Sequence, residues 1–193
     1  MAALTAIVID YMDEQAKAGA AMLQVFEAMG AHITPEAFDE FALPCLRTIA
    51  QELKKRHPGT PLLVFTRDAM HANEKIAALG YDVITLDLSV TDRPAVRAAL
   101  AAEAAARGGG AAPARVQGNF DPRLLYTDGG ASDEEMEAAV RAMIGGFGPQ
   151  GLIANLGEGL CGKEDPARVS KFVDLVHSVS EELIAHEKAA VTA

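Results

Sequence analysis

Short apolar runs alternate along this chain with longer segments whose apolar residues recur at helical spacing. Leu4, Ile7 and Tyr11 fall on one helical face, whereas Leu62-Leu63-Val64-Phe65 has the composition of a buried strand. We expect strands near residues 21–26, 62–66, 83–87, 114–117 and 151–155. Strands that alternate with helices form parallel βαβ units. The fold class is therefore α/β, either an open doubly wound sheet or part of a barrel.

Local signals mark the ends of several expected helices. Thr34-Pro35 offers an N-cap followed by proline at the first helical position. Pro44 should kink or divide the helix that follows, because proline lacks the backbone N–H. A helix over residues 68–79 should stop at Gly80, and Ser132-x-x-Glu135 is a capping box.

Length and charge restrict the class of protein. The 193 residues are half hydrophobic, which suits a single domain over 1–193. No apolar run is long enough to span a membrane, and the N-terminus lacks the pattern of a secretory signal or a transit peptide. The net charge of −10 argues against nucleic acid and anionic membranes as partners. Cys45 and Cys161 form no disulfide framework, so we expect an intracellular location.

The common nucleotide and metal motifs are missing from the sequence. No Gly-x-Gly-x-x-Gly follows the first expected strand, and there is no Walker loop. His32 and His71 have no second ligand at metal spacing, so no metal site is expected. Cys161 could react, but no histidine or arginine stands beside it in sequence to lower its pKa.

The most informative stretch is Asn155-Leu156-Gly157-Glu158-Gly159, which follows the last expected strand. The end of a strand opening into a glycine-flanked turn is where α/β enzymes present functional groups. Glu158 is then either an acid of the site, a solvated turn residue or the partner of a nearby arginine. Arg67, at another strand end, could bind a carboxylate or pair with Asp68 or Asp87.

Asn119 and Asp121 also follow an expected strand, and this position predicts that they are residues of the functional site. For Asp121-Pro122 the alternative is that the aspartate caps a helix.

Six motifs in register give the chain a family resemblance. They are Leu23-Gln24-Val25-Phe26-Glu27, Phe41-Ala42-Leu43-Pro44, Gly80-Tyr81-Asp82-Val83 with Leu86-Asp87, Gln117-Gly118-Asn119-Phe120-Asp121-Pro122, Asp165-Pro166 with its helix, and the Glu158 turn. Together they resemble the uroporphyrinogen decarboxylase family over nearly the whole chain. The resemblance corresponds to the C-terminal half of the family's protein.

The resemblance implies a fold and an activity. The family fold is a (β/α)8 barrel of about 250 residues, so five strands would make a partial TIM-type barrel. The family removes carbon dioxide from four acetates of uroporphyrinogen, giving coproporphyrinogen in porphyrin, heme and chlorophyll synthesis, without metal or organic cofactor. A tetrapyrrole substrate, a homodimer and a place in the cytoplasm or plastid follow by resemblance.

The resemblance also implies which residues matter. The family's catalytic aspartate and arginines correspond to no residue of this chain, so no catalytic residue is expected in it. Two substrate-contacting positions are substituted: Ala28 stands for a serine, and Glu158 for a histidine. A glutamate there would repel an octacarboxylate, by about 1 kcal/mol per charge pair at ~4 Å in water and about 4 near a protein surface. The expected pocket-lining residues are Phe26, Arg67, Gly118, Asn119, Asn155 and Gly157.

Two functions remain open. The chain is a uroporphyrinogen decarboxylase homologue, incomplete and weakly active or inactive alone, or a non-catalytic relative that serves as a structural or assembly subunit. A five-stranded piece of a barrel has two open edges. We expect Phe26, Phe65, Leu86 and Val116 to face its half-filled core. A homo-oligomer or a partner chain should then complete the barrel.

Overall fold

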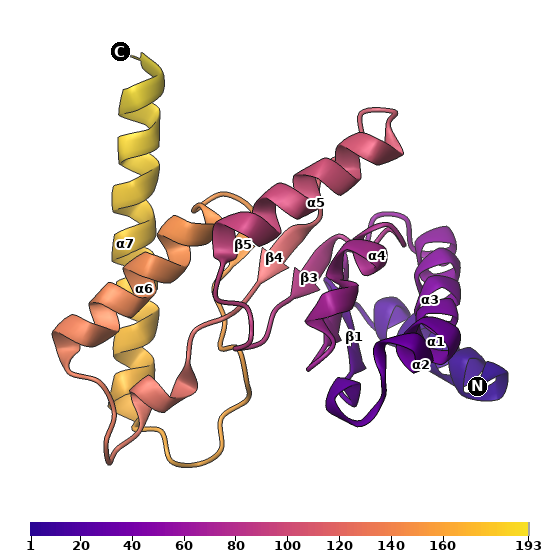
Figure 1. Cartoon of the computed structure of the whole chain (residues 1–193), viewed down its shortest axis with the longest axis horizontal. Coiled ribbons are helices and arrows are strands. Elements are labelled where there is room, and N and C mark those ends of the chain that lie inside the picture. Colours follow the sequence, from indigo (N-terminus) through magenta and orange to yellow (C-terminus); the bar gives the residue numbers. More distant parts are fainter. Residues whose placement is uncertain (193) are drawn as a thin grey trace.

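Five parallel strands form a single sheet in the computed structural model, which describes residues 1–192 (Figure 1). The strands are β1 (Leu23–Glu27), β2 (Leu62–Thr66), β3 (Val83–Thr85), β4 (Arg115–Gln117) and β5 (Leu152–Ile153). They lie side by side in chain order. A doubly wound sheet reverses its strand order at a switch point, whereas a barrel keeps it. All five predicted strands are confirmed, and the order is that of part of a TIM-type barrel.

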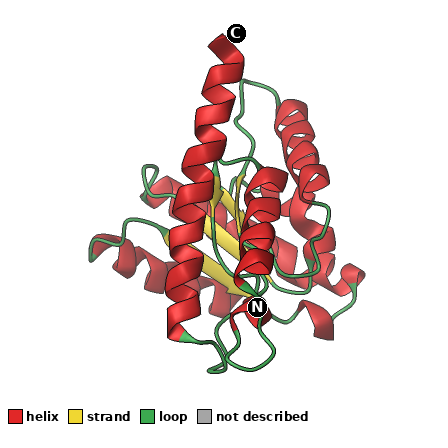
Figure 2. Ribbon diagram, turned by 90° about the vertical axis from the view of Figure 1, so that its left-hand side faces the viewer, coloured by secondary structure: helices red, strands yellow, loops and turns green. Residues whose placement is uncertain are grey.

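The helices alternate with the strands and surround them in the view of Figure 2, where α7 crosses in front of the sheet. The α-helices are α1 (Ala2–Lys17), α2 (Pro35–Ala37), α3 (Leu43–Arg56), α4 (Asn73–Ala77), α5 (Arg93–Arg107), α6 (Asp133–Phe147) and α7 (Pro166–Thr192). Short 3₁₀ turns cover Gly30–His32, Met70–Ala72 and Pro122–Leu125, and a π-helical turn covers Phe38–Ala42.

The predicted helix ends are largely confirmed. Thr34 accepts a hydrogen bond from the Ala37 amide, and Ser132 with Glu135 forms both bonds of the capping box. The π turn ahead of α3 divides the helix near Pro44, as its missing N–H requires. The helix predicted over 68–79 is shorter, because Asp68 adopts a positive φ of 59° that no helix accommodates and a 3₁₀ turn precedes α4.

The core lies on the helix-covered face of the sheet. Leu23, Val25 and Val64 belong to this core together with Ile84 and side chains of α3 and α6. Leu86 and Val116 are fully buried in it as well. The prediction that these two face the open interior is therefore wrong. Side chains alternate between the two faces of a strand; Leu86 is two residues from Ile84 and Val116 pairs with it, so all three lie on the same face.

The opposite face carries the residues that the barrel interior would hold. Phe26 pairs in register with Phe65, Thr85 with Gln117, and Gln117 with Ile153. Phe26 is 68% exposed, and its ring meets Phe65 edge to face with centroids 6.3 Å apart. The prediction for these two phenylalanines is confirmed.

The sheet is curved around this open face. Gln117 Nε2 donates to Gln24 Oε1 at 3.2 Å and to Thr85 Oγ1 at 3.0 Å. Gln24 lies on β1 and Gln117 on β4, with β2 and β3 between them. In a flat sheet these two strands would stand about 14 Å apart, which is beyond the reach of two glutamine side chains. Their contact therefore shows the curvature of a barrel wall.

Candidate functional site

The carboxyl ends of the five strands meet along one edge of the sheet, as parallel pairing requires. Glu27-Ala28 leaves β1, Arg67-Asp68 leaves β2, and Asp87 lies just beyond β3. Gly118-Asn119 follows β4, and the turn 154–159 follows β5. The predicted site residues therefore share this edge, but they differ in what their side chains do.

Arg67 and Glu158 face each other across the mouth of the sheet. Arg67 Nη2 lies 3.9 Å from Glu158 Oε1, and Arg67 Nε lies 3.7 Å from Asp68 Oδ2. The side chains of Arg67 and Glu158 are 46% and 44% exposed, so the pair is accessible to a ligand. The predicted pairings of Arg67 with Asp68 and of Glu158 with an arginine are confirmed.

Asp87 is not a partner of Arg67. This buried carboxylate accepts hydrogen bonds from the Asp68 amide at 2.8 Å and from the amide and hydroxyl of Ser89 at 2.9 and 2.6 Å. The alternative that paired it with Arg67 is wrong, because its hydrogen bonds come from Asp68 and Ser89 instead. Asp87 therefore ties the end of β2 to the loop that follows β3.

A second arginine stands near Glu158. Arg123 binds Asp121 with Nε 2.9 and 3.0 Å from the two carboxylate oxygens. The Asp121 carboxylate, and to a smaller extent Glu158, raises the pKa of Arg123. Asp121 also accepts a hydrogen bond from the Arg123 amide at 2.9 Å at the start of the 3₁₀ turn, which confirms it as a cap. Glu158 thus lies near two arginines, each of which also has an aspartate partner.

Asn119 is a positioning residue in this structure. Its side chain is buried, with Nδ2 donating to the carbonyls of Asp87 and Val90 at 2.7 and 2.8 Å. Its Oδ1 accepts from Arg93 Nε at 2.9 Å. Because these bonds are internal, Asn119 fixes the loop between β3 and α5. The sequence could not separate this role from ligand binding, since both place an asparagine after a strand.

The glycines of the edge allow close backbone packing. A Cβ on Gly157 would come 2.6 Å from Leu88 Cδ2, and the Gly157 amide donates to the Phe120 carbonyl at 2.8 Å. The Asn155 carbonyl accepts from the Phe120 amide at 2.9 Å, while the residue itself is exposed. These contacts hold the Glu158 turn against the end of β4.

The exposed thiol of Cys161 has partners that the sequence did not predict. The Tyr126 hydroxyl lies 3.2 Å and Glu164 Oε1 lies 3.4 Å from its sulfur. The bond to Cys161 raises the pKa of Tyr126 to about 12.

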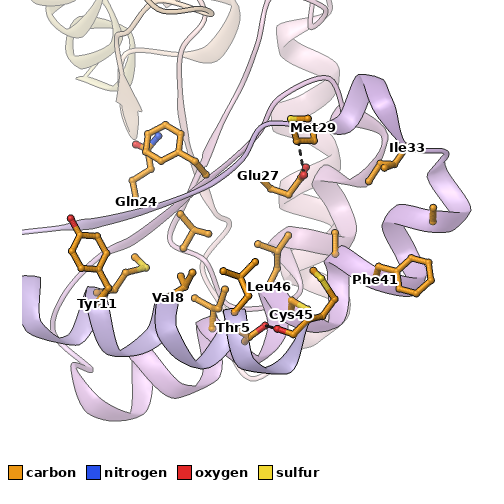
Figure 3. Close-up of a pocket in the computed structure, with 18 of the residues that line it drawn as sticks. Thr5, Val8, Tyr11, Gln24, Glu27, Met29, Ile33, Phe41, Cys45 and Leu46 are labelled. Atoms are coloured by element: carbon orange, nitrogen blue, oxygen red, sulfur yellow. Dashed lines mark hydrogen bonds between the residues drawn. The ribbon is translucent and has the colours of Figure 1, made fainter.

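An apolar groove of about 490 Å³ lies beside β1 (Figure 3). Residues of α1, β1 and α3 line it, including Val8, Tyr11, Phe26 and Cys45. Ala28, at the exit of β1, is exposed but is not one of its lining residues. The apolar face of the first helix was the sequence signal for this groove, but its position beside an open strand edge was not predictable.

Residues 1–192 contain no cluster of three or more histidine, cysteine or acidic side chains placed to bind a metal. None of the helices in that range is long and apolar enough to cross a membrane.

Known proteins match this chain over most of its length. Residues 1–179 match the family described as Uroporphyrinogen decarboxylase (URO-D). The chain is 40% identical over 182 residues to uroporphyrinogen decarboxylase of Mus musculus, a match that covers 92% of this chain and 46% of the relative. The enzymes of Salinibacter ruber and Schizosaccharomyces pombe are 38% and 35% identical, over 93% and 90% of this chain and 46% of their own length.

The chain thus spans about half the length of the curated relatives that it matches. The five parallel strands in chain order and the curved sheet agree with that match. The chain belongs to the uroporphyrinogen decarboxylase family.

Proposed function

We propose that this chain is the C-terminal, five-stranded part of a uroporphyrinogen decarboxylase, and that it acts on uroporphyrinogen only when further strands complete its barrel. The observation that carries the proposal is the curved sheet of five strands with open edges at β1 and β5. A complete barrel has eight strands, so about three more are required. The match to about half of each relative supports the same conclusion.

The proposed role of the chain's own residues is to bind the substrate. Arg67 is half exposed at the mouth of the sheet and offers a planar donor suited to a carboxylate side chain of the tetrapyrrole. Phe26 and Phe65 supply an apolar wall on the same face. An apolar wall favours the loss of neutral carbon dioxide from an acetate carboxylate placed against it, with the electron pair of the broken bond passing to the pyrrole ring, which the resemblance implies is protonated. Arg67 would hold a different carboxylate of the substrate in place.

Glu158 limits this binding. Its carboxylate shares Arg67 with any incoming ligand, so a substrate carboxylate must displace it. Ala28 offers no hydroxyl where the family has a serine. We therefore propose that this site binds the substrate less tightly than the family's own serine and histidine would.

The completing strands have, in this proposal, a sequence different from this chain's own. A second copy of the chain would bring the strand count to ten, not eight. The homodimer that the resemblance implies would then form between completed barrels. Because Cys45 and Cys161 are free thiols, we place the assembly inside the cell, in the cytoplasm or a plastid.

The test is an assay of uroporphyrinogen decarboxylation by chromatography. The chain is assayed alone and after coexpression with the part of the Mus musculus enzyme outside the matched region. We expect no turnover from the chain alone, measurable turnover from the pair, and a loss of about tenfold or more in kcat/KM for Arg67→Gln. Turnover by the chain alone would refute the need for further strands.

The second candidate is a non-catalytic subunit that assembles with a related enzyme. The substitutions at Ala28 and Glu158 favour it. A pair that forms a stable complex without turnover, and that stays inactive after Ala28→Ser and Glu158→His are introduced together, would support this candidate over the enzyme.

A further inference from the structure

A cavity of about 350 Å³ lies where the segments that follow β3 and β4 meet α6. Residues 88–93, residues 119–124 and α6 supply its walls. Both β3 and β4 have a strand on each side, so the open edges of the sheet do not form this cavity. Most of its lining is apolar and consists of Leu88, Val90, Phe120, Leu124, Ala139 and Ala142.

Arg93, the first residue of α5, brings a cation to this cavity. Its Nε donates to Asn119 Oδ1 at 2.9 Å, and its guanidinium carbon lies 5.7 Å from the centre of the Phe147 ring. The aliphatic part of the side chain packs on α6, since a Cβ added to Gly146 would lie 3.0 Å from Arg93 Cβ. These contacts hold the guanidinium in one place, which lowers the entropy cost of binding a ligand there.

The Arg93 guanidinium lacks a negative partner. Within residues 1–192 no carboxylate lies at ion-pair distance from it, and its two Nη groups have no hydrogen-bond acceptor. Its neighbour Asp92 instead caps α5 by accepting a hydrogen bond from the Ala95 amide at 3.0 Å. The Arg93 side chain is half-buried, and this burial lowers the pKa of the guanidinium. A cation that has lost part of its hydration without gaining an anion favours the binding of one.

The charged residues of the lining indicate which anion fits. Arg123 also lines the cavity, but its Nε lies 2.9 and 3.0 Å from the two carboxylate oxygens of Asp121. The two arginines and one aspartate of the lining therefore leave a net charge of +1. One negative charge matches this lining better than the two charges of a phosphate. The apolar wall then suits a short hydrocarbon body.

We infer that this cavity binds a small monocarboxylic acid, with its carboxylate on the Nη groups of Arg93 and its apolar body against Leu88 and Phe120. A planar guanidinium binds a carboxylate through two parallel hydrogen bonds. Thr91 adds a hydroxyl to the same lining. The inference does not depend on the proposed function, because binding requires no turnover of uroporphyrinogen.

The cavity adjoins the turn that carries Glu158. The Gly157 amide donates to the Phe120 carbonyl at 2.8 Å, and a Cβ on Gly157 would come 2.6 Å from Leu88 Cδ2. Phe120 and Leu88 therefore contact the turn on one side and line the cavity as well. An acid bound against them should change the surroundings of the Gly157 amide.

The experiment is a titration of the chain with benzoate, in which calorimetry gives the Kd and NMR follows the amide shifts. Benzamide has the same ring without the charge, and inorganic phosphate has charge without the apolar body. Each ligand is titrated into the wild type, and benzoate also into Arg93→Gln and into Ala142→Phe, which would fill the cavity from α6.

Two matched variants serve as controls. Arg97→Gln makes the same charge change one turn further along α5, where Arg97 bonds to the Gln150 carbonyl and does not line the cavity. Ala138→Phe places the same ring at an exposed position of α6 outside the lining. Circular dichroism establishes that each variant is folded.

We expect the wild type to bind benzoate with a Kd below about 5 mM, and benzamide and phosphate at least about tenfold more weakly. Arg93→Gln and Ala142→Phe should each raise the Kd about tenfold or more, whereas Arg97→Gln and Ala138→Phe should stay within about twofold of the wild type. The largest amide shifts should occur at Phe120 and Gly157.

Three results would each overturn the inference. The first is a benzoate Kd above about 5 mM in the wild type. The second is an equal effect of Arg93→Gln and Arg97→Gln, which would mean that net charge alone attracts the anion. The third is a set of amide shifts confined to Val8 and Tyr11, which would place benzoate in the groove beside β1.

Discussion

The backbone of Gly118 lies directly against Leu86: a Cβ built on Gly118 would come 2.6 Å from the Leu86 carbonyl oxygen. Gly118 also has a φ of +125°, which side-chain-bearing residues rarely adopt. The contact joins the ends of β3 and β4, where the loop with Asn119 begins. We expect Gly118→Ala to lower the free energy of unfolding by about 1–3 kcal/mol, measured by urea denaturation.

Gly145 provides the control for this prediction. It lies in α6 without a positive φ, and a Cβ there would meet no atom within 4 Å. Gly145→Ala should raise the free energy of unfolding by about 0.5–1 kcal/mol, since alanine favours a helix. Equal destabilisation by the two substitutions would show that the close approach at Gly118 is not the cause.

The side-chain hydrogen bonds of Gln117 should contribute more to the free energy of unfolding than that of Gln24. The buried Gln117 side chain donates to both Thr85 and Gln24, whereas the half-buried Gln24 side chain bonds, among residues 1–192, only to Gln117. Gln117→Ala leaves two polar groups without their donor, at a cost of about 1–3 kcal/mol. Gln24→Ala should cost clearly less in the same urea titration. The reverse ranking would mean that the additional bond from Gln117 to Thr85 does not contribute to stability.

Local sequence signals predicted most of the fold. The strands, the capping box at Ser132 and the division of the helix near Pro44 each depend on residues close in sequence. The faces on which Leu86 and Val116 lie were predicted wrongly. All three residues of β3 are buried, and in β4 Val116 and Gln117 are buried on opposite faces, so the pairing register is needed to assign the sides.

The candidate site was less predictable for a related reason. Arg67, Glu158 and Asn119 were recognised from their positions at strand ends. The amide side chain of an asparagine after a strand can form the same hydrogen bonds to a ligand or to the backbone of a neighbouring loop. Only the fold brings Asn119 to the carbonyls of Asp87 and Val90. The groove beside Glu27 depends on which strand edge lacks a neighbour, and periodicity within one segment carries no information about that.

Acid should weaken the attachment of α1 to α3 through Asp13. Hydrogen bonds from Lys17 and His57 lower the pKa of Asp13 to about 2. Arg56 Nη1 lies 3.2 Å from Asp13 Oδ2. A lowered folded-state pKa contributes stability above the unfolded pKa of about 4, and this contribution is lost as the pH falls through the folded value. The difference in Tm between wild type and Asp13→Asn should therefore be present at pH 6 and shrink between about pH 4 and pH 2. A constant difference over that range would contradict it.

Glu158→Gln should improve the binding of polycarboxylates without changing stability. The ion pair with Arg67 is half exposed, and such pairs contribute about 0–1 kcal/mol. Removing one negative charge near the ligand should raise the affinity for uroporphyrin at least about fivefold at low salt, measured by fluorescence titration. Glu181→Gln makes the same charge change at an exposed position on α7, outside the turn with Glu158, and should change the affinity little. Equal effects of the two variants would point to net charge alone.

Glu27→Gln should stabilise the chain. Burial raises the pKa of this carboxyl, which means that the native state disfavours its charged form. That penalty is present above the folded pKa and disappears below the unfolded value of about 4.3, where both states are protonated. Glutamine keeps an acceptor for the Met29 amide and carries no charge. Its Tm should exceed that of the wild type at pH 7, and the two should converge near pH 4. Glu40→Gln, which is exposed, should show no such convergence, and a Glu27→Gln variant less stable than the wild type at pH 7 would mean that a cation of this chain already binds Glu27.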